Sequence, residues 1–123
     1  MLDRDLIVTK LKKYFVKKEE VEFAYLFGSV ARGDTYKLSD IDIAVMCKDE
    51  CKILRLMAEI SHLLRFDEVD VVDLRKSKNL RLLKDIIKEG IVLKDSPRRW
   101  KWELRKYHQA LDFMNHTKVV YGY

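Results

Sequence analysis

The chain has 123 residues, of which 48% are hydrophobic and 37% charged, and it carries a formal net charge of +5 at pH 7. This length suits one domain, and the composition excludes a disordered or fibrous protein. No apolar run approaches the roughly 18 residues that a membrane span needs, and the N-terminus lacks the apolar core of a signal peptide. We therefore expect a cytoplasmic protein that has no contact with a membrane.

Helical and strand patterns alternate along the chain. Apolar residues spaced by three and four predict an amphipathic helix over 3–18, and aromatic and β-branched residues predict a buried strand from Val21 to Phe27. A polar segment with a short helical turn follows. The later elements are a strand at 40–46, a helix at 50–64, a strand at 69–74, a helix from 80 to Gly90, an edge strand at 91–93 and a last helix from Pro97. This order predicts a layered α/β domain in which helices cover a sheet.

Two aspartates in the strand 40–46 are candidate metal ligands. Asp40 and Asp42 are two residues apart, so their side chains should project from the same face of the strand. Carboxylates this close repel each other unless a divalent cation lies between them. Mg²⁺ prefers oxygen ligands and binds one or two protein carboxylates, together with waters and substrate phosphates. The pattern therefore predicts a magnesium site.

A third carboxylate would allow two metal ions to be held side by side. Asp70 is the best candidate, because we expect a half-buried position in the strand 69–74, where an aspartate needs a partner or a metal. Asp67 and Asp73 flank the same strand and remain alternatives, although aspartates at strand ends are often turn residues.

The turn after the first strand is a candidate phosphate site. Gly28 lets a phosphate approach the backbone closely, and the backbone N–H groups and the Ser29 hydroxyl can bind it. Arg32 follows one turn later and could neutralise more of a triphosphate's charge. Taken alone, Gly28 and Ser29 are more typical of an ordinary helix cap, and it is their combination with the aspartates that favours a phosphate site.

These motifs together resemble a known family. Gly28-Ser29, ten intervening residues and Asp40-Ile41-Asp42 resemble the signature of the DNA polymerase β nucleotidyltransferase superfamily, and GSVARGDTYKLSDIDIAV resembles its minimal, MntA-type branch. The resemblance runs from about Phe23 through Leu93 and implies a central mixed sheet. It also implies that Asp40 and Asp42 bind two Mg²⁺ ions with the triphosphate.

The resemblance further implies roles for the remaining site residues. Asp70 would bind the catalytic ion and help to deprotonate the acceptor, while Gly28 and Ser29 would hold the β- and γ-phosphates. The reaction would be an in-line displacement at the α-phosphorus with pyrophosphate as the leaving group, so catalysis would consist mostly of positioning and charge neutralisation.

The identity of the acceptor is less constrained. Minimal nucleotidyltransferases are paired with helical HEPN toxins, so the resemblance implies an antitoxin that transfers AMP from ATP to a tyrosine of such a partner. Basic stretches at 75–88 and 97–118 favour a competing acceptor, an RNA 3′ end, unless they are solvated helix faces. Another alternative is a catalytically weak antitoxin that blocks a toxin or RNA sterically. The intact aspartates and the GS turn favour the enzyme.

The C-terminal segment offers a candidate docking surface. Apolar residues alternate at spacings of four and three, a seam typical of helices that dock on another helix: Trp100, Leu104, Tyr107, Leu111 and Met114. The alternative is that this seam packs on its own domain. We therefore expect a nucleotidyltransferase domain at 1–96, and a helix and tail at 97–123 that either complete it or dock a partner.

The two cysteines, Cys47 and Cys51, lie four residues apart. Without a second pair they cannot form a four-cysteine zinc site, so we expect reduced thiols of a cytosolic protein.

Overall fold

The computed structural model describes residues 3–33 and 40–120, and it describes side chains up to residue 111. The elements are α1 (Arg4–Val16), β1 (Val21–Phe27), α2 (Gly28–Arg32), β2 (Ile41–Cys47), α3 (Ile53–Leu64), β3 (Val69–Asp73), α4 (Leu80–Glu89), β4 (Ile91–Lys94) and α5 (Pro97–Val120). Each helix and strand predicted from the sequence is present, with boundaries shifted by at most a few residues. No helix within the described ranges is both long and apolar enough to cross a membrane.

The four strands form one mixed sheet in the order β3-β2-β1-β4. β1 is antiparallel to both β2 and β4, whereas β2 and β3 are parallel. This pairing brings the starts of β2 and β3 to the end of the sheet where β1 finishes. We call this the aspartate end, and we call the opposite end, where β1 begins and β2 finishes, the disulfide end.

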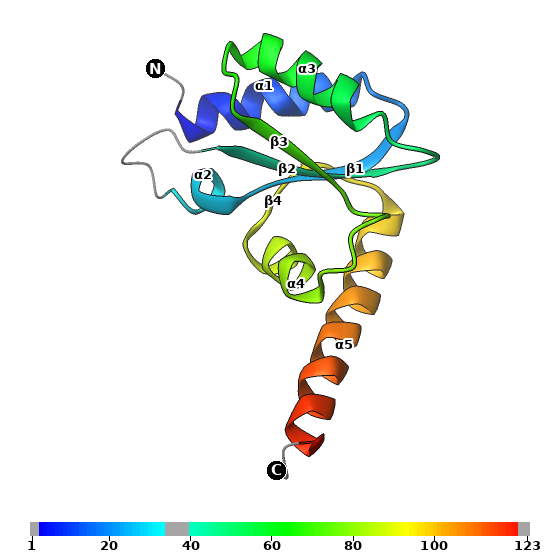
Figure 1. The fold of residues 1–123 in the computed structure, drawn as a ribbon. Helices are drawn as coiled ribbons and strands as arrows, with labels where there is room; N and C mark the ends of the chain where they lie inside the picture. The colour runs from blue at the N-terminus through cyan, green and yellow to red at the C-terminus, as the bar shows by residue number, and fades with distance from the viewer. Residues whose placement is uncertain (1–2, 34–39, 121–123) are drawn as a thin grey trace.

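Helices cover both faces of the sheet (Figure 1). α1 and α3 pack on one face, where Ile7, Leu11 and Phe15 of α1 are at most 1% exposed. α4 and the first half of α5 pack on the other. The expected alternation in β2 is confirmed, since Ile43 faces the first core and Ala44 the second. Each fully buried large apolar side chain contributes about 1.5–3 kcal/mol, so both layers stabilise the sheet that carries the site.

The first half of α5 is attached to its own domain. Trp102 and Ala110 are buried, and the Tyr25 hydroxyl in β1 donates a hydrogen bond to Glu103. Arg99 Nη1 also donates to Glu103 Oε1, at 2.7 Å. Burial and the neighbouring Glu103 carboxylate raise the pKa of Tyr25 above its usual range, so this hydroxyl stays protonated as a donor.

The predicted apolar seam of α5 is not the face that packs on the domain. Trp100 and Leu104 are 56% and 52% exposed, and Tyr107 and Leu111 are partly exposed. The Met114 side chain lies outside the described residues. Trp100 and Leu104 therefore do not pack on their own domain, because the helix turns Trp102 and Ala110 toward the sheet instead.

The two cysteines form a disulfide, which corrects the expectation of reduced thiols. Cys47 ends β2, and the turn that follows folds back so that Cys51 lies beside it, with the Cα atoms 5.5 Å apart. Both residues are buried in the core under α3. The predicted start of the helix at residue 50 moves to Ile53 because this cross-linked turn occupies the preceding residues.

Candidate functional site

Asp42 and Asp70 lie side by side at the aspartate end. They are direct partners in the parallel pairing of β2 and β3. Because side chains alternate along a strand, Asp42 shares its face with Ala44, and Asp70 shares its face with Val72. Both of these neighbours belong to the core under α4 and α5, so the two carboxylates project from the same face of the sheet.

Two expectations about the carboxylates were wrong: that Asp40 belongs to the strand, and that Asp70 is half-buried. β2 begins at Ile41, so Asp40 precedes the strand and is exposed. Asp70 is also exposed, not half-buried as expected, because it is the second residue of the edge strand β3. Asp42 is the partly buried member of the group, since its strand lies inside the sheet.

The electrostatic environment of Asp42 disfavours its charge. Burial raises the pKa of the Asp42 carboxyl, and the negative charges of Asp70 and then Asp40 raise it further. Arg32 acts in the opposite direction and lowers this pKa. The dominant effects make a nearby cation favourable, because a cation would offset both the burial and the repulsion.

The donor set fits Mg²⁺ as a shared ion, not as a complete protein cage. Within 3–33 and 40–111, no three His, Cys, Asp or Glu side chains are grouped closely enough to hold a metal by themselves. Mg²⁺ needs only one or two protein carboxylates when substrate phosphates and waters complete its shell. The paired Asp42 and Asp70 meet that requirement.

Gly28 is fitted against Asp42. Its φ of +78° lies in the left-handed region, and a Cβ built at this position would lie 2.3 Å from Asp42 Oδ2. The pairing of Phe27 with Asp42 across β1 and β2 causes this close approach. A side chain at position 28 would therefore displace the carboxylate, so the glycine is what allows Asp42 to lie against the turn.

Ser29 and Arg32 lie on α2, the short helix that begins at Gly28. Arg32 Nη1 lies 3.2 Å from Glu89 Oε2 at the end of α4, an ion pair that the sequence analysis did not anticipate. Its only signal in the sequence is a carboxylate just before the helix-ending Gly90. Arg32 therefore forms an ion pair with Glu89 and also lowers the pKa of Asp42.

Asp67 and Asp73, the alternatives to Asp70 as third ligand, are not direct strand partners of Asp42. Asp73 is three residues further along β3, and its Oδ1 accepts a hydrogen bond of 3.0 Å from the Arg75 backbone N–H, as a turn residue does. Asp67 is exposed and precedes the strand. Asp34 and Ser39, within the matching motif, lie outside the described residues.

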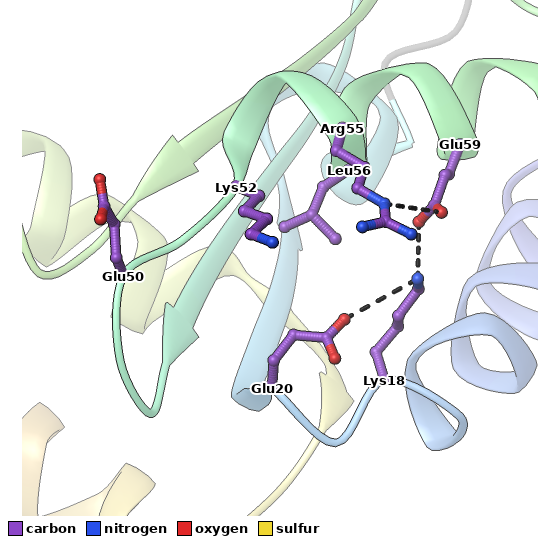
Figure 2. A pocket seen from close by; sticks show the side chains of 7 residues that line it. All are labelled: Lys18, Glu20, Glu50, Lys52, Arg55, Leu56 and Glu59. Carbon is purple, nitrogen blue, oxygen red and sulfur yellow. Dashed lines mark ion pairs between the residues drawn. The ribbon is translucent and has the colours of Figure 1, made fainter.

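A separate pocket of about 220 Å³ lies at the disulfide end, between α1, β1 and α3 (Figure 2). Figure 2 shows Lys18 between two carboxylates: its Nζ is 2.7 Å from Glu59 Oε1 and 3.8 Å from Glu20 Oε1. Arg55 Nε lies 3.5 Å from Glu59 Oε2. The Tyr14 hydroxyl donates to Glu59 at 2.6 Å, so the charges of Lys18, Arg55 and Glu59 are paired within the protein.

Comparison with solved structures supports the fold. A chain in the structure of a tri-AMPylated Shewanella oneidensis HEPN toxin in complex with MNT antitoxin aligns with a TM-score of 0.71 and 21% identity, over 95% of this chain and 94% of that one. A chain of a toxin–antitoxin structure with AMP-PNP gives a TM-score of 0.66 and 24% identity, over 96% and 91%. Among curated proteins, no sequence matches.

The family model described as "Polymerase beta, Nucleotidyltransferase" matches residues 9–99, well over half of the sequence. This match includes the GS turn, the aspartates and the whole sheet. It confirms the relationship expected from the motif, and the fold agrees with that of MntA-type structures. The chain belongs to the polymerase β nucleotidyltransferase family.

Proposed function

We propose that this chain catalyses the Mg²⁺-dependent transfer of AMP from ATP to a hydroxyl group of a protein partner, a tyrosine of a helical HEPN toxin, and thereby acts as an antitoxin. The observation that carries the proposal is the pair Asp42 and Asp70, with Asp42 packed against Gly28, in a member of a nucleotidyltransferase family. ATP and the acceptor hydroxyl of the partner would both be bound at the aspartate end. We assign this activity to the cytoplasm, where ATP is available.

In this proposal the carboxylates hold the metal and move a proton. Asp42 and Asp70, with Asp40 and the triphosphate completing the ligand set, would hold two Mg²⁺ ions. Bound Mg²⁺ supplies neutralisation of the phosphate charge and polarises the α-phosphate. Asp70 accepts the proton of the acceptor hydroxyl as its oxygen bonds to the α-phosphorus, and the bond from that phosphorus to pyrophosphate breaks.

The GS turn positions the leaving group. The Gly28 backbone and the Ser29 hydroxyl bind the β- and γ-phosphates, and Arg32 offsets part of their charge when it leaves Glu89. The close approach of Gly28 to Asp42 places this turn next to the proposed metal site. Positioning of this kind accounts for most of the catalysis in phosphoryl transfer.

Two observations support a protein acceptor. The similar folds include a chain from a complex with a tri-AMPylated HEPN toxin and a chain from a toxin–antitoxin complex with AMP-PNP. In addition, α5 presents Trp100 and Leu104 to solvent, as a helix that docks a partner would. The segment 97–123 then serves both its own domain, through Trp102, and the partner.

The test offers α-labelled ATP and Mg²⁺ to the chain together with the helical protein encoded beside it and with a tRNA pool. We expect label on a tyrosine of the partner, and none with the Asp42→Asn variant. Label on RNA alone would replace the proposal with an RNA 3′-end transferase. A stable complex with the partner, but no label on protein or RNA, would instead support a catalytically weak antitoxin that blocks its target sterically.

The docking face has its own test. Leu104→Asp combined with Leu111→Asp should lower partner labelling at least about tenfold, because charges would be buried in the interface. Leu54→Asp is the matched control, since Leu54 is 81% exposed on α3 and far from this seam. Equal labelling by all three proteins would exclude the seam from partner binding.

A further inference from the structure

A second cavity, of about 400 Å³, lies at the disulfide end on the α5 side of the sheet. It is bounded by the start of β1, the end of β2, the turn after β3 and the first turns of α5. Its basic lining residues are Lys48, Arg75, Arg98, Lys101 and Arg105. We propose that this cavity binds a ligand carrying two or more phosphates, at a site separate from the aspartates.

The cavity keeps most of its positive charge. Its one acidic lining residue, Glu22, pairs with Arg98 at 3.4 Å. Lys48, Lys101 and Arg105 have no carboxylate partner within the described part of the chain. Neutralisation of Arg98 therefore leaves four basic groups facing a single cavity, an arrangement whose mutual repulsion an anionic ligand would relieve.

Arg75 is held in place without being neutralised. Its Nη2 donates to the backbone carbonyls of Cys47 and Lys48, both at 2.7 Å. Carbonyl acceptors fix the guanidinium but leave its full charge, and a fixed guanidinium is well suited to phosphate oxygens. The two carbonyls belong to the start of the turn that the disulfide closes, so this part of the cavity is preorganised.

The wall of the cavity also contains an unused donor. Trp102 lines the cavity and is 5% exposed, and its indole Nε1 is buried with no acceptor in the described structure. Buried polar groups almost always have a partner. The ring of Trp102 itself lines the cavity, so its fluorescence can report on a ligand bound there.

The length of the basic face favours more than one phosphate. Arg98, Lys101 and Arg105 are spaced by three and four, so they follow one face of α5. Their seven-residue span corresponds to about 10 Å of helix, more than a single phosphate can bridge. A nucleic acid strand or a free polyphosphate has the required chemistry.

The other pocket at this end provides a contrast. Its lining has three basic and three acidic side chains, and Lys18 and Arg55 are already paired with carboxylates (Figure 2). That pocket needs no ligand to balance its charge. The proposal is therefore specific to the cavity beside α5.

The experiment uses Trp102 fluorescence in a Trp100→Phe background, in EDTA, so that magnesium-dependent binding at the aspartates does not contribute. Sodium triphosphate and a single-stranded oligouridylate are titrated separately at constant ionic strength. We expect a saturable change in emission with at least one probe. Tighter binding of the oligonucleotide identifies nucleic acid as the source, and binding of triphosphate alone identifies free polyphosphate.

Two variants separate a site from general charge. Lys101→Gln with Arg105→Gln should weaken binding at least tenfold and lessen its salt dependence, because two contacts to phosphate are lost. Lys12→Gln with Lys13→Gln removes the same charge from exposed positions of α1 and should change affinity less than twofold. Lys48→Gln provides a second cavity variant.

Three results would overturn the proposal: no saturable binding, equal weakening by both double variants, or equal affinity for polyglutamate, which would indicate an acidic protein surface. The Asp42→Asn variant should bind the probes unchanged. This result is independent of nucleotide transfer, so failure here and failure of the proposed function can be distinguished.

Discussion

The two ends of the sheet handle charge in opposite ways. At the disulfide end, the Glu59 carboxylate accepts from Lys18 and Tyr14, and these contacts lower its pKa. At the aspartate end, burial and neighbouring carboxylates raise the pKa of Asp42. The paired charges connect α1 and α3 and stabilise the fold. The clustered carboxylates destabilise the metal-free protein, and a bound cation would remove this destabilisation. The contrast indicates that the aspartate cluster, unlike the Glu59 cluster, is arranged to bind a cation.

The largest expected effect separates activity from stability. Asp42→Asn or Asp70→Asn should lower nucleotide transfer at least about 1000-fold, because metal-bound charge stabilisation is worth several kcal/mol. Glu59→Gln, at the other end, should leave transfer unchanged. Initial rates with labelled ATP measure both. Full activity of Asp42→Asn would remove the metal assignment, and full activity of Asp70→Asn would remove Asp70 from the metal site.

A matched pair of glycines sharpens the assignment of the aspartate end. Gly28 and Gly33 both have positive φ, so alanine at either position should cost about 1 kcal/mol of backbone strain. Only at Gly28 would the new Cβ meet a carboxylate; at Gly33 its nearest neighbour is Arg4 Nη1 at 3.6 Å. We expect similar unfolding free energies but about 100-fold lower transfer for Gly28→Ala alone. Equal rates would make the GS turn a structural cap only.

The disulfide end can be weakened by reduction. Opening the Cys47–Cys51 bridge should lower the free energy of unfolding by about 2 kcal/mol, the value expected for so short a loop. Denaturation with and without a reducing agent measures this change. The Cys47→Ala, Cys51→Ala double variant should not respond to the reductant. An identical response of the wild type would mean that its thiols are reduced in solution.

The smallest expected effect is a change in the free energy of unfolding, and its sign should differ between the two ends of the sheet. The Asp42 pKa is raised, so its charged form destabilises the metal-free fold, and Asp42→Asn should stabilise it at pH 7 by less than about 1 kcal/mol, since solvent screens this partly exposed group. The Glu59 pKa is lowered, so Glu59→Gln should destabilise the fold by about 0.5–1 kcal/mol.

The changes in stability of both variants should disappear as the wild-type carboxylates become protonated at low pH. The gain in Asp42→Asn should disappear as pH falls through the raised Asp42 pKa toward 3.8, and the loss in Glu59→Gln should disappear as pH falls below 4.5. Urea denaturation of metal-free protein between pH 3 and 7 measures both. The same sign for the two variants at pH 7 would contradict the contrast between the ends.

The sequence predicted the elements well because their patterns are local. Apolar alternation in β2 and the aspartates two residues apart are visible in the printed chain, and so is the glycine that ends α4. The face of Asp70 followed from the same alternation. Its exposure did not, because it depends on β3 being an edge strand.

The features that the sequence did not predict depend on contacts between distant segments. Arg32 meets Glu89 across 57 positions, and Arg75 meets the carbonyl of Cys47 across 28. The buried face of α5 was also missed, since two tryptophans two residues apart, Trp100 and Trp102, give no local sign of which one packs on the sheet. The disulfide depends on the turn geometry after β2.

The contact between Gly28 and Asp42 also limits how this protein can evolve. An added methyl group at position 28 would occupy the space of the Asp42 carboxylate. The usual compensating change, a smaller residue at position 42, would delete the proposed metal ligand. We therefore expect the two positions to be constrained together, and reversion to glycine to be the most direct way for a lineage that has lost it to regain transfer.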